Sequence, residues 1–320
     1  MTVVLGIWAR GINNPRGYWT IDGYLPFTRI EPAVAGMGNK LYVLGGAPNN
    51  SLDEVNTFYS FDTTTKLTSV LSQSTISKRA GMWAASDGSE FIYFGGGYDY
   101  PYNVYDAVWK YSTITGTWTS LAAGPWGYVS GYLARPIQQQ ALFLNNQIWV
   151  YSGNTSVAKY DIATNIWTYH QIYVNVGGSP YSYQVVMAEH ANKLLFYNLQ
   201  DDRRIREYDP LTNSVTTLAK LFPLDGYLGS FGGSADNGMV IAGGSETGGV
   251  TSTQTYRYNR PNNAWSISLR TSNIPVMHCG FTVLSNDLYS VGGQIKSSTD
   301  GGVTITTSYT AAIQKYTIPS

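Results

Sequence analysis

The chain carries little charge and almost no cysteine. Only 12% of its 320 residues are charged, and 20 basic side chains balance 20 acidic ones. A neutral chain lacks the basic surface of a nucleic-acid-binding protein and the acidic excess of a disordered tail. The single Cys excludes a disulfide scaffold and a Cys-rich zinc module. We therefore expect a core held together by packing alone.

Long apolar runs are missing as well. No stretch reaches the roughly 18 consecutive apolar residues of a membrane helix. Residues 1–15 lack a basic segment followed by an apolar core and a cleavage site, so we expect no secretory signal. No segment shows an apolar stripe of helical period. The abundant residues are Gly (34) and Tyr (26), and the chain is also rich in Thr and Ser, which together favour strands and turns.

Strand-like segments that end in glycine recur along the chain at intervals of about 50 residues. Repeats of this period indicate solenoids or propellers. The six segments are LYVLGG (41–46), FIYFGG (91–96), IWVYSG (148–153), LLFYN (194–198), MVIAGG (239–244) and LYSVGG (288–293).

A second pattern follows each of these segments. A strand ending in Tyr is joined by a short polar turn to a strand that begins at Trp, seven residues after the Tyr. Apolar and polar residues alternate in these segments, as in half-buried strands. Four strands per unit account for both patterns. The Tyr–Trp pairs are Tyr111 with Trp118, Tyr160 with Trp167 and Tyr258 with Trp265, while Val215 replaces the Trp that would follow Tyr208.

Gly-Gly followed by Tyr and then Trp resembles the Kelch repeat of β-propellers, whose period is roughly 50 residues. The resemblance covers nearly the whole chain. It is weakest in the third and fourth units, because Ser152 replaces the first Gly of one and the other has neither the Gly pair nor the Trp. The resemblance implies an all-β fold: a single domain over residues 1–320 that forms a six-bladed propeller.

The sixth unit ends without a Trp strand. Residues 3–10 resemble the missing strand, with Trp8 in the Trp position. A propeller closes so that no sheet edge is left unpaired at its seam. We therefore expect residues 3–10 to complete the last blade and residues 11–28 to form an insert. The expected blades are 29–72, 78–122, 137–170, 182–219, 229–269 and 276–318.

The repeat predicts structural roles for the paired glycines and for one Trp in each unit. Glycine at a strand end supplies positive φ or a close backbone approach, and no phosphate-binding motif follows these pairs. The Trp side chains are expected to pack between neighbouring blades. The predicted structural residues are Gly45, Gly46, Gly95, Gly96, Gly243, Gly244, Gly292, Gly293, Trp8, Trp118, Trp167 and Trp265.

The loops divide into a short set and a long set, which lie on opposite faces of a four-stranded meander. Long loops on a rigid scaffold commonly carry function, and Tyr and Trp suit protein interfaces and sugar stacking. Arg203 and Arg204 belong either to an anion-binding loop or to a self-neutralising solvated one. The aromatic candidates for binding are Tyr18, Trp19, Tyr24, Tyr98, Tyr100, Tyr102, Tyr105, Trp126, Tyr128, Tyr132, Tyr173, Tyr181 and Tyr183.

Candidates for catalysis are few. Kelch-like propellers include sialic-acid mutarotases and copper-dependent relatives of galactose oxidase, but the copper pattern is not matched here. Glu31, Arg79 and His278 are expected near the mouth of the channel and would be the catalytic residues of an enzyme. Adjacent strand residues point to opposite faces, which argues against a nucleophilic pair of Cys279 and His278. Cys279 is expected to be buried and structural. The three His fall in unlike positions, so we expect no metal and no cofactor.

Three functions remain open at this stage. The first is a non-enzymatic module of a bacteriophage virion (tail, fibre or capsid-associated) that binds a host surface glycan or docks another virion protein. Near-zero charge, one Cys and an excess of Gly, Tyr and Thr make the chain similar in composition to such proteins, which assemble in the host cytoplasm. The second is a carbohydrate-active enzyme of the mutarotase kind, and the third is a cytoplasmic Kelch-type adaptor. None implies nucleic-acid binding or membrane insertion.

Overall fold

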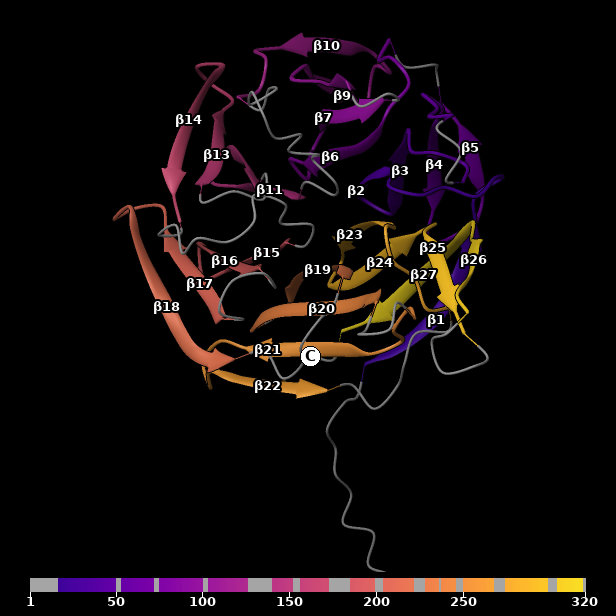
Figure 1. Cartoon of the computed structure of the whole chain (residues 1–320). Coiled ribbons are helices and arrows are strands. Elements are labelled where there is room, and N and C mark those ends of the chain that lie inside the picture. The colour runs from indigo at the N-terminus through magenta and orange to yellow at the C-terminus, as the bar shows by residue number, and fades with distance from the viewer. Residues whose placement is uncertain are drawn as a thin grey trace, which may run out of the picture.

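Six antiparallel sheets surround a central axis and form a six-bladed β-propeller (Figure 1). All the elements of secondary structure among the described residues are β-strands. No helix able to cross a membrane occurs among these residues. The computed structural model describes residues 17–49, 53–71, 75–99, 103–125, 140–151, 156–172, 185–198, 204–221, 228–235, 237–245, 250–267, 274–298 and 304–318.

Each blade is a four-stranded sheet that runs outward from the axis. The first blade is β2 (Ala33–Met37), β3 (Lys40–Leu44), β4 (Phe58–Asp62) and β5 (Thr68–Val70). The second is β6 (Ala80–Ser86), β7 (Phe91–Asp99), β9 (Val108–Ser112) and β10 (Trp118–Leu121), with β8 (Asn103–Val104) paired to β7. The third is β11 (Gln140–Leu144), β12 (Gln147–Tyr151), β13 (Ser156–Asp161) and β14 (Ile166–Gln171).

The remaining three blades follow the same plan. The fourth is β15 (Val185–His190), β16 (Lys193–Asn198), β17 (Arg204–Asp209) and β18 (Ser214–Leu221). The fifth is β19 (Leu228–Ala235), β20 (Gly238–Ser245), β21 (Thr255–Asn259) and β22 (Ala264–Ile267). The sixth is β23 (Gly280–Leu284), β24 (Asp287–Val291), β27 (Ala312–Thr317) and β1 (Tyr18–Tyr24), and a separate hairpin joins β25 (Gln294–Ser297) to β26 (Thr306–Tyr309).

An N-terminal strand closes the ring, but it is not the strand that the sequence predicted. β1 pairs with β27, so residues 18–24 complete the sixth blade from within the expected insert 11–28. Trp19 lies opposite Tyr316, which repeats the Tyr–Trp pairing of the second, third and fifth blades. Residues 3–10, including Trp8, lie outside the described residues.

The Trp residues of the outer strands pack against the preceding blade. Trp118 contacts Phe58 of the first blade, with ring centroids 5.2 Å apart, and Trp265 contacts Tyr197 of the fourth blade. Trp167 contacts Trp83 and donates its indole N–H to the carbonyl of Ala122 at 3.1 Å. These contacts make the outer half of each blade part of its neighbour's core.

Trp19 plays the same part at the seam. It is 6% exposed, its ring packs on Phe231, and its indole donates to Thr255 Oγ1 at 2.8 Å. Both partners belong to the fifth blade. Trp19 is therefore a buried inter-blade side chain, which corrects its assignment to the binding surface.

The glycine pairs join adjacent blades through their backbone. The first amide bonds its own blade, as Gly45 N–H does to Thr57 O at 3.1 Å. The second bonds the next blade, as Gly46 N–H does to Arg79 O at 3.0 Å. Both positions need a left-handed backbone, which favours glycine. The pairs are Gly45 and Gly46 (φ 68° and 85°), Gly96 and Gly97 (66° and 86°), Gly243 and Gly244 (63° and 86°) and Gly292 and Gly293 (67° and 119°).

In the second blade this pair is shifted by one residue from the prediction. Gly96 and Gly97 occupy the two left-handed positions, whereas Gly95 lies within β7 opposite Trp83. A Cβ on Gly95 would collide with the Trp83 indole. Gly95 is therefore required by side-chain packing rather than by its backbone conformation.

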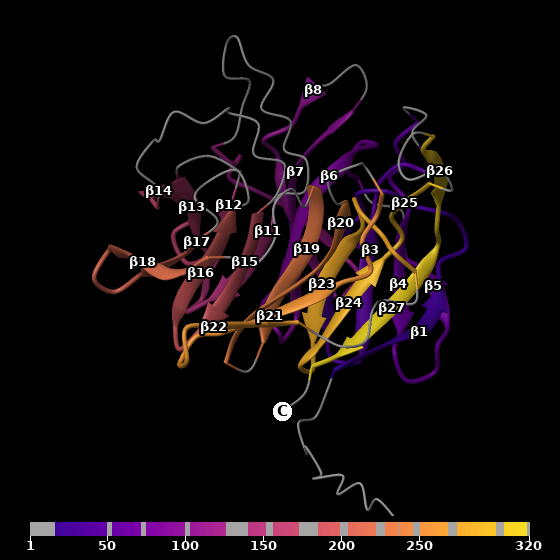
Figure 2. The same cartoon turned by 60° about the horizontal axis from the view of Figure 1, so that its bottom comes forward.

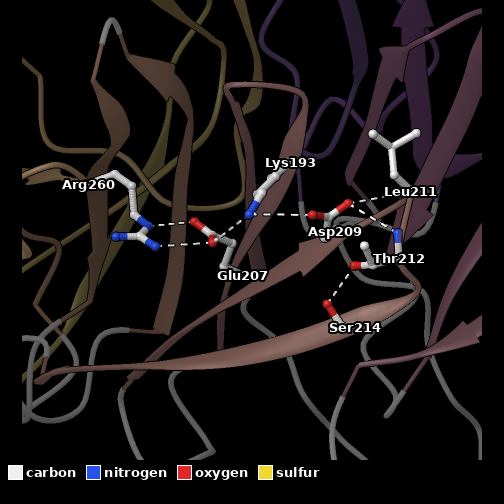
Figure 3. Close-up of polar contacts among 7 residues, drawn as sticks. All are labelled: Lys193, Glu207, Asp209, Leu211, Thr212, Ser214 and Arg260. Carbon is white, nitrogen blue, oxygen red and sulfur yellow. Dashed lines mark hydrogen bonds and ion pairs between the residues drawn. The ribbon is translucent and has the colours of Figure 1, made fainter.

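An ionic cluster links the fourth and fifth blades (Figure 3). Glu207, which is 6% exposed, accepts two hydrogen bonds from the Arg260 guanidinium, at 2.5 Å and 3.1 Å. Lys193 lies between Glu207 and Asp209, 3.5 Å and 3.4 Å from their carboxylate oxygens. The hydrogen bond from Arg260 lowers the pKa of Glu207, so the carboxylate stays ionised although it is buried.

Candidate functional site

The connections between strands fall on two unlike faces, as the repeat predicts. The short-turn face carries tight hairpins such as the one that joins β11 to β12, where Asn145 and Asn146 have φ of 53° and 59°. Two left-handed residues are the signature of a type I′ turn. The opposite, long-loop face carries the β7–β9 and β24–β27 connections. Figure 2 shows β8 and the β25–β26 hairpin rising on that side.

A cavity of about 310 Å³ lies on the propeller axis, between the innermost strands. Its walls combine apolar side chains with neutral polar groups, and residues of all six innermost strands contribute to them. Hydroxyl and amide groups are contributed by Ser86, Gln140, Ser234 and Thr282. The larger apolar side chains that line it are Val34, Met82, Leu142, Phe143, Met187, Phe281 and Val283.

Glu31 lies at the end of this cavity nearest the long-loop face. It precedes β2 and is 7% exposed. Its Oε2 accepts a hydrogen bond from the Tyr98 hydroxyl at 2.5 Å. Its Oε1 lies 3.0 Å from His278 Nδ1, an ion-pair distance, although the ring is not aligned for a hydrogen bond. Carboxylate, phenol and imidazole are thus brought together from the first, second and sixth blades.

The backbone around this cluster is unusual. Glu31 and His278 have φ of 51° and 52°, which a side chain with a Cβ seldom adopts. The cause is a chain of hydrogen bonds across the blades: Glu31 N–H donates to His278 O at 2.7 Å, and Gly81 N–H donates to Glu31 O at 3.0 Å. Gly81 holds the same conformation in the second blade, with φ of 67°. Two of these three positions carry ionisable residues where glycine would fit without strain.

Arg79 is buried beside the mouth rather than in it. It is 2% exposed, donates to Gly96 O at 3.1 Å and to Ser77 Oγ at 2.5 Å, and packs under the Tyr105 ring. Burial lowers the pKa of its guanidinium to about 10. Because its donors are used by the second blade, the structure assigns Arg79 to anchoring the β7–β9 connection. It is not among the described residues that line the cavity.

Gln140 ties three blades together at the cavity wall. Its amide nitrogen donates to Met187 O at 2.8 Å and to Gly232 O at 3.0 Å, and its carbonyl accepts from Met187 N–H. These side-chain hydrogen bonds all reach the fourth and fifth blades, although Gln140 begins β11 of the third. A side chain so fully bonded narrows the cavity rather than offering a free polar group.

The aromatic candidates that the structure describes lie in different parts of the propeller. Tyr18 and Tyr24 lie on β1 at the outer rim, 43% and 59% exposed, and Tyr18 is at the end nearer the short-turn face. Tyr98 and Tyr105 are half-buried in the β7–β9 connection, where Tyr105 donates to the Asp99 carboxylate. Outside the described residues lie Tyr100, Tyr102, Trp126, Tyr128, Tyr132, Tyr173, Tyr181, Tyr183 and Arg203.

Other polar candidates contribute little to the site. Arg204 begins β17 on the long-loop side of the fourth blade and is half-buried. Cys279 is a buried free thiol, and burial raises its pKa, so it does not provide a thiolate nucleophile. Among the described residues, no group of three or more His, Cys, Asp or Glu side chains is placed to hold a metal ion.

The sequence did not pair Tyr98 with Glu31. Tyr98 directly follows the glycine pair of β7, and this position carries it to the neighbouring blade's mouth residue. The sequence predicted Gly95 and Gly96 as the pair, so it did not place Tyr98 directly after the pair.

Comparison with known proteins supports the fold. No family model matches the chain, and no curated protein matches it. Among solved structures, one titled "Structure of YjhT" is similar with a TM-score of 0.66 at 16% sequence identity, over 89% of this chain and 99% of that one. At this identity the likeness shows the six-bladed propeller fold alone.

Proposed function

We propose that this protein is a non-enzymatic binding module of a bacteriophage virion, which recognises a host surface glycan with its long-loop face. A six-bladed propeller fits a binding or structural module. The observation that carries the proposal is the division of the connections: tight turns on one face, and long connections with β8 and the β25–β26 hairpin on the other. Loops held by a rigid scaffold are where recognition usually occurs.

Charge and side-chain type also favour a glycan. The chain has no net charge, so long-range attraction does not drive its association. Half-buried aromatic side chains of the β7–β9 connection on the long-loop face, Tyr98 and Tyr105, offer ring surface beside the cavity mouth. Sugar rings stack on such surfaces without needing opposite charge.

The test is binding to the surface polysaccharide of candidate hosts, measured by calorimetry. Trp126→Ala and Tyr100→Ala, which the sequence places on the long-loop face, are expected to weaken binding about tenfold or more, since stacked aromatics dominate recognition surfaces. Matched controls are Ile114→Ala and Leu211→Ala on the short-turn face, which are 75% and 88% exposed. Equal loss in the controls would contradict the proposal. Capture of a virion protein with no glycan bound would shift the role from attachment to assembly.

A carbohydrate-active enzyme is the second candidate, and Glu31 beside His278 at the cavity mouth favours it. A paired carboxylate and imidazole can move protons during sugar ring opening. An acidic sugar fits poorly, because Glu31 is negative and Arg79 is turned into the second blade. Anomer interconversion of neutral sugars, followed by NMR, would be lost in His278→Ala if the pair is catalytic. No acceleration in the unmodified protein would exclude this activity for the sugars tested.

A further inference from the structure

The axial cavity has one charged group among the described residues that line it, and that group is the Glu31 carboxylate. A carboxylate with 7% exposure is costly to keep ionised unless a cation or several hydrogen-bond donors face it. The charge balance of the cavity mouth therefore indicates what the cavity accepts.

Glu31 has a partial set of partners. Tyr98 donates one neutral hydrogen bond to Oε2. His278 lies at ion-pair distance from Oε1, but histidine does not carry a permanent positive charge as Lys and Arg do. No Lys or Arg of the described residues forms an ion pair with Glu31, and the Arg79 guanidinium instead donates to Gly96 and Ser77.

The rest of the cavity adds a second constraint. Below Glu31 the wall offers the apolar side chains of Val34, Met82, Leu142 and Phe281 beside neutral hydroxyl and amide groups, with no second charge among the described lining residues. A cavity of about 310 Å³ is at the small end of ligand pockets. It suits a compact body that packs on these apolar side chains rather than an oligosaccharide.

Backbone strain at the same residue is a third and independent observation. Glu31 and His278 keep left-handed φ although Gly81 shows that glycine fills this position in a neighbouring blade. Strain of this kind is typically found at ligand sites. An ionisable side chain at such a position therefore points to a role for the side chain itself.

We propose that the axial cavity binds a small organic cation, an amine with an apolar body, whose ammonium group pairs with Glu31 at the mouth. The ammonium donates to Oε1, on the side where His278 is poorly aligned, while Tyr98 continues to hold Oε2. The apolar body fills the space between the innermost strands and contacts Phe281 and Leu142. This site adjoins the long-loop face at Tyr98, but it is inferred independently of glycan binding.

The experiment compares three probes of nearly equal shape on the full chain: benzylamine, benzyl alcohol and benzoate. Binding is measured by calorimetry and by the shift of the thermal melting temperature. Benzylamine is expected to bind at least tenfold more tightly than benzyl alcohol, since hydrogen bonds to charged groups are stronger than neutral ones. Benzoate is expected not to bind, because its charge repels that of Glu31. This comparison needs no variant.

Two variants locate the site. Glu31→Gln keeps the shape and removes the charge, and Glu31→Gly is compatible with the left-handed backbone, so at least one should fold. Each is expected to lose the preference for benzylamine. The matched control is Asp287→Asn, a carboxylate that pairs with Lys315 and does not line the cavity; it should keep the preference. Equal binding of benzylamine and benzyl alcohol, no binding of benzylamine, or unchanged benzylamine binding in Glu31→Gln would each overturn the proposal.

Discussion

The pair formed by Arg260 and Glu207 is asymmetric in burial, so its two halves are not equivalent. Arg260→Met leaves a carboxylate of 7% side-chain exposure with only Lys193 nearby, at 3.5 Å. We expect this to lower the free energy of unfolding by about 2 kcal/mol or more, toward the range for an unpaired buried charge. Glu207→Gln leaves Arg260, 29% exposed, which water can reach, and is expected to cost about 1 kcal/mol. Urea unfolding of the two variants gives the comparison.

A double variant completes this prediction. Arg260→Met combined with Glu207→Gln removes both charges, so it should recover part of the loss seen in Arg260→Met alone. A double variant that is less stable than the sum of the single changes would mean that the pair does not act as a unit. Low pH offers a second check. The pKa of Glu207 is lowered by Arg260, so its stabilisation is present above the unfolded pKa and is lost as pH falls through the folded value.

Single residues also show the limit of sequence reasoning. The period of the repeat located the glycine pairs of the first, fifth and sixth blades, but the three consecutive glycines of the second blade allowed two registers, and the left-handed backbone selects Gly96 and Gly97. Glu31 and His278 were placed near the channel because they precede innermost strands. Their contact could not be predicted, since it depends on left-handed backbone at residues where sequence statistics expect none.

At the scale of the element, β1 is the strand on which closure depends. A chain that begins at Gly17 keeps every described contact of β1, whereas one that begins at Phe27 loses the strand and exposes β27. We expect the first to melt near the full-length chain. The second should aggregate or melt far lower, because it also removes Trp19 from between the fifth and sixth blades. Thermal melting followed by circular dichroism compares them.

A point variant separates strand pairing from side-chain packing. Trp19→Ala retains β1 but deletes a buried aromatic side chain, for which the usual cost is about 3–5 kcal/mol. Equal melting of the full-length chain and the chain that begins at Phe27 would show that β1 is not needed for closure.

The choice of closing strand could not be made from the sequence. In the second, third and fifth blades a Trp seven residues after a Tyr marks the outer strand, but in the sixth the two residues come from opposite ends of the chain. Without that spacing, the sequence predicted Trp8 as the closing Trp and Trp19 as part of the binding surface. The sheet register decides between them, because Trp19 faces Tyr316.

At the scale of the whole molecule, part of the high tyrosine content comes from one contact that is repeated in several blades. Tyrosines occupy the same buried position in several blades, as Tyr160, Tyr208 and Tyr258 do, and each donates to an Asn in the following turn. The Asn residues have left-handed φ, so the sequence Tyr–x4–Asn links a strand to its own turn. Because buried tyrosines recur around the ring, we expect the stability of the whole molecule to depend on the ionisation of tyrosine.

Alkaline pH should therefore unfold the propeller as a unit. Burial raises the pKa of Tyr208 to about 12 and raises the pKa values of Tyr93 and Tyr289 as well. A folded pKa above the unfolded value near 10 means full stability below about pH 10 and progressive loss above it. Titration followed by tyrosinate absorbance and circular dichroism should show a set of tyrosines that ionise only as the sheet signal is lost. Tyr93→Phe removes one such group and should make the decline shallower; ionisation of all 26 tyrosines with the sheet signal intact would contradict this coupling.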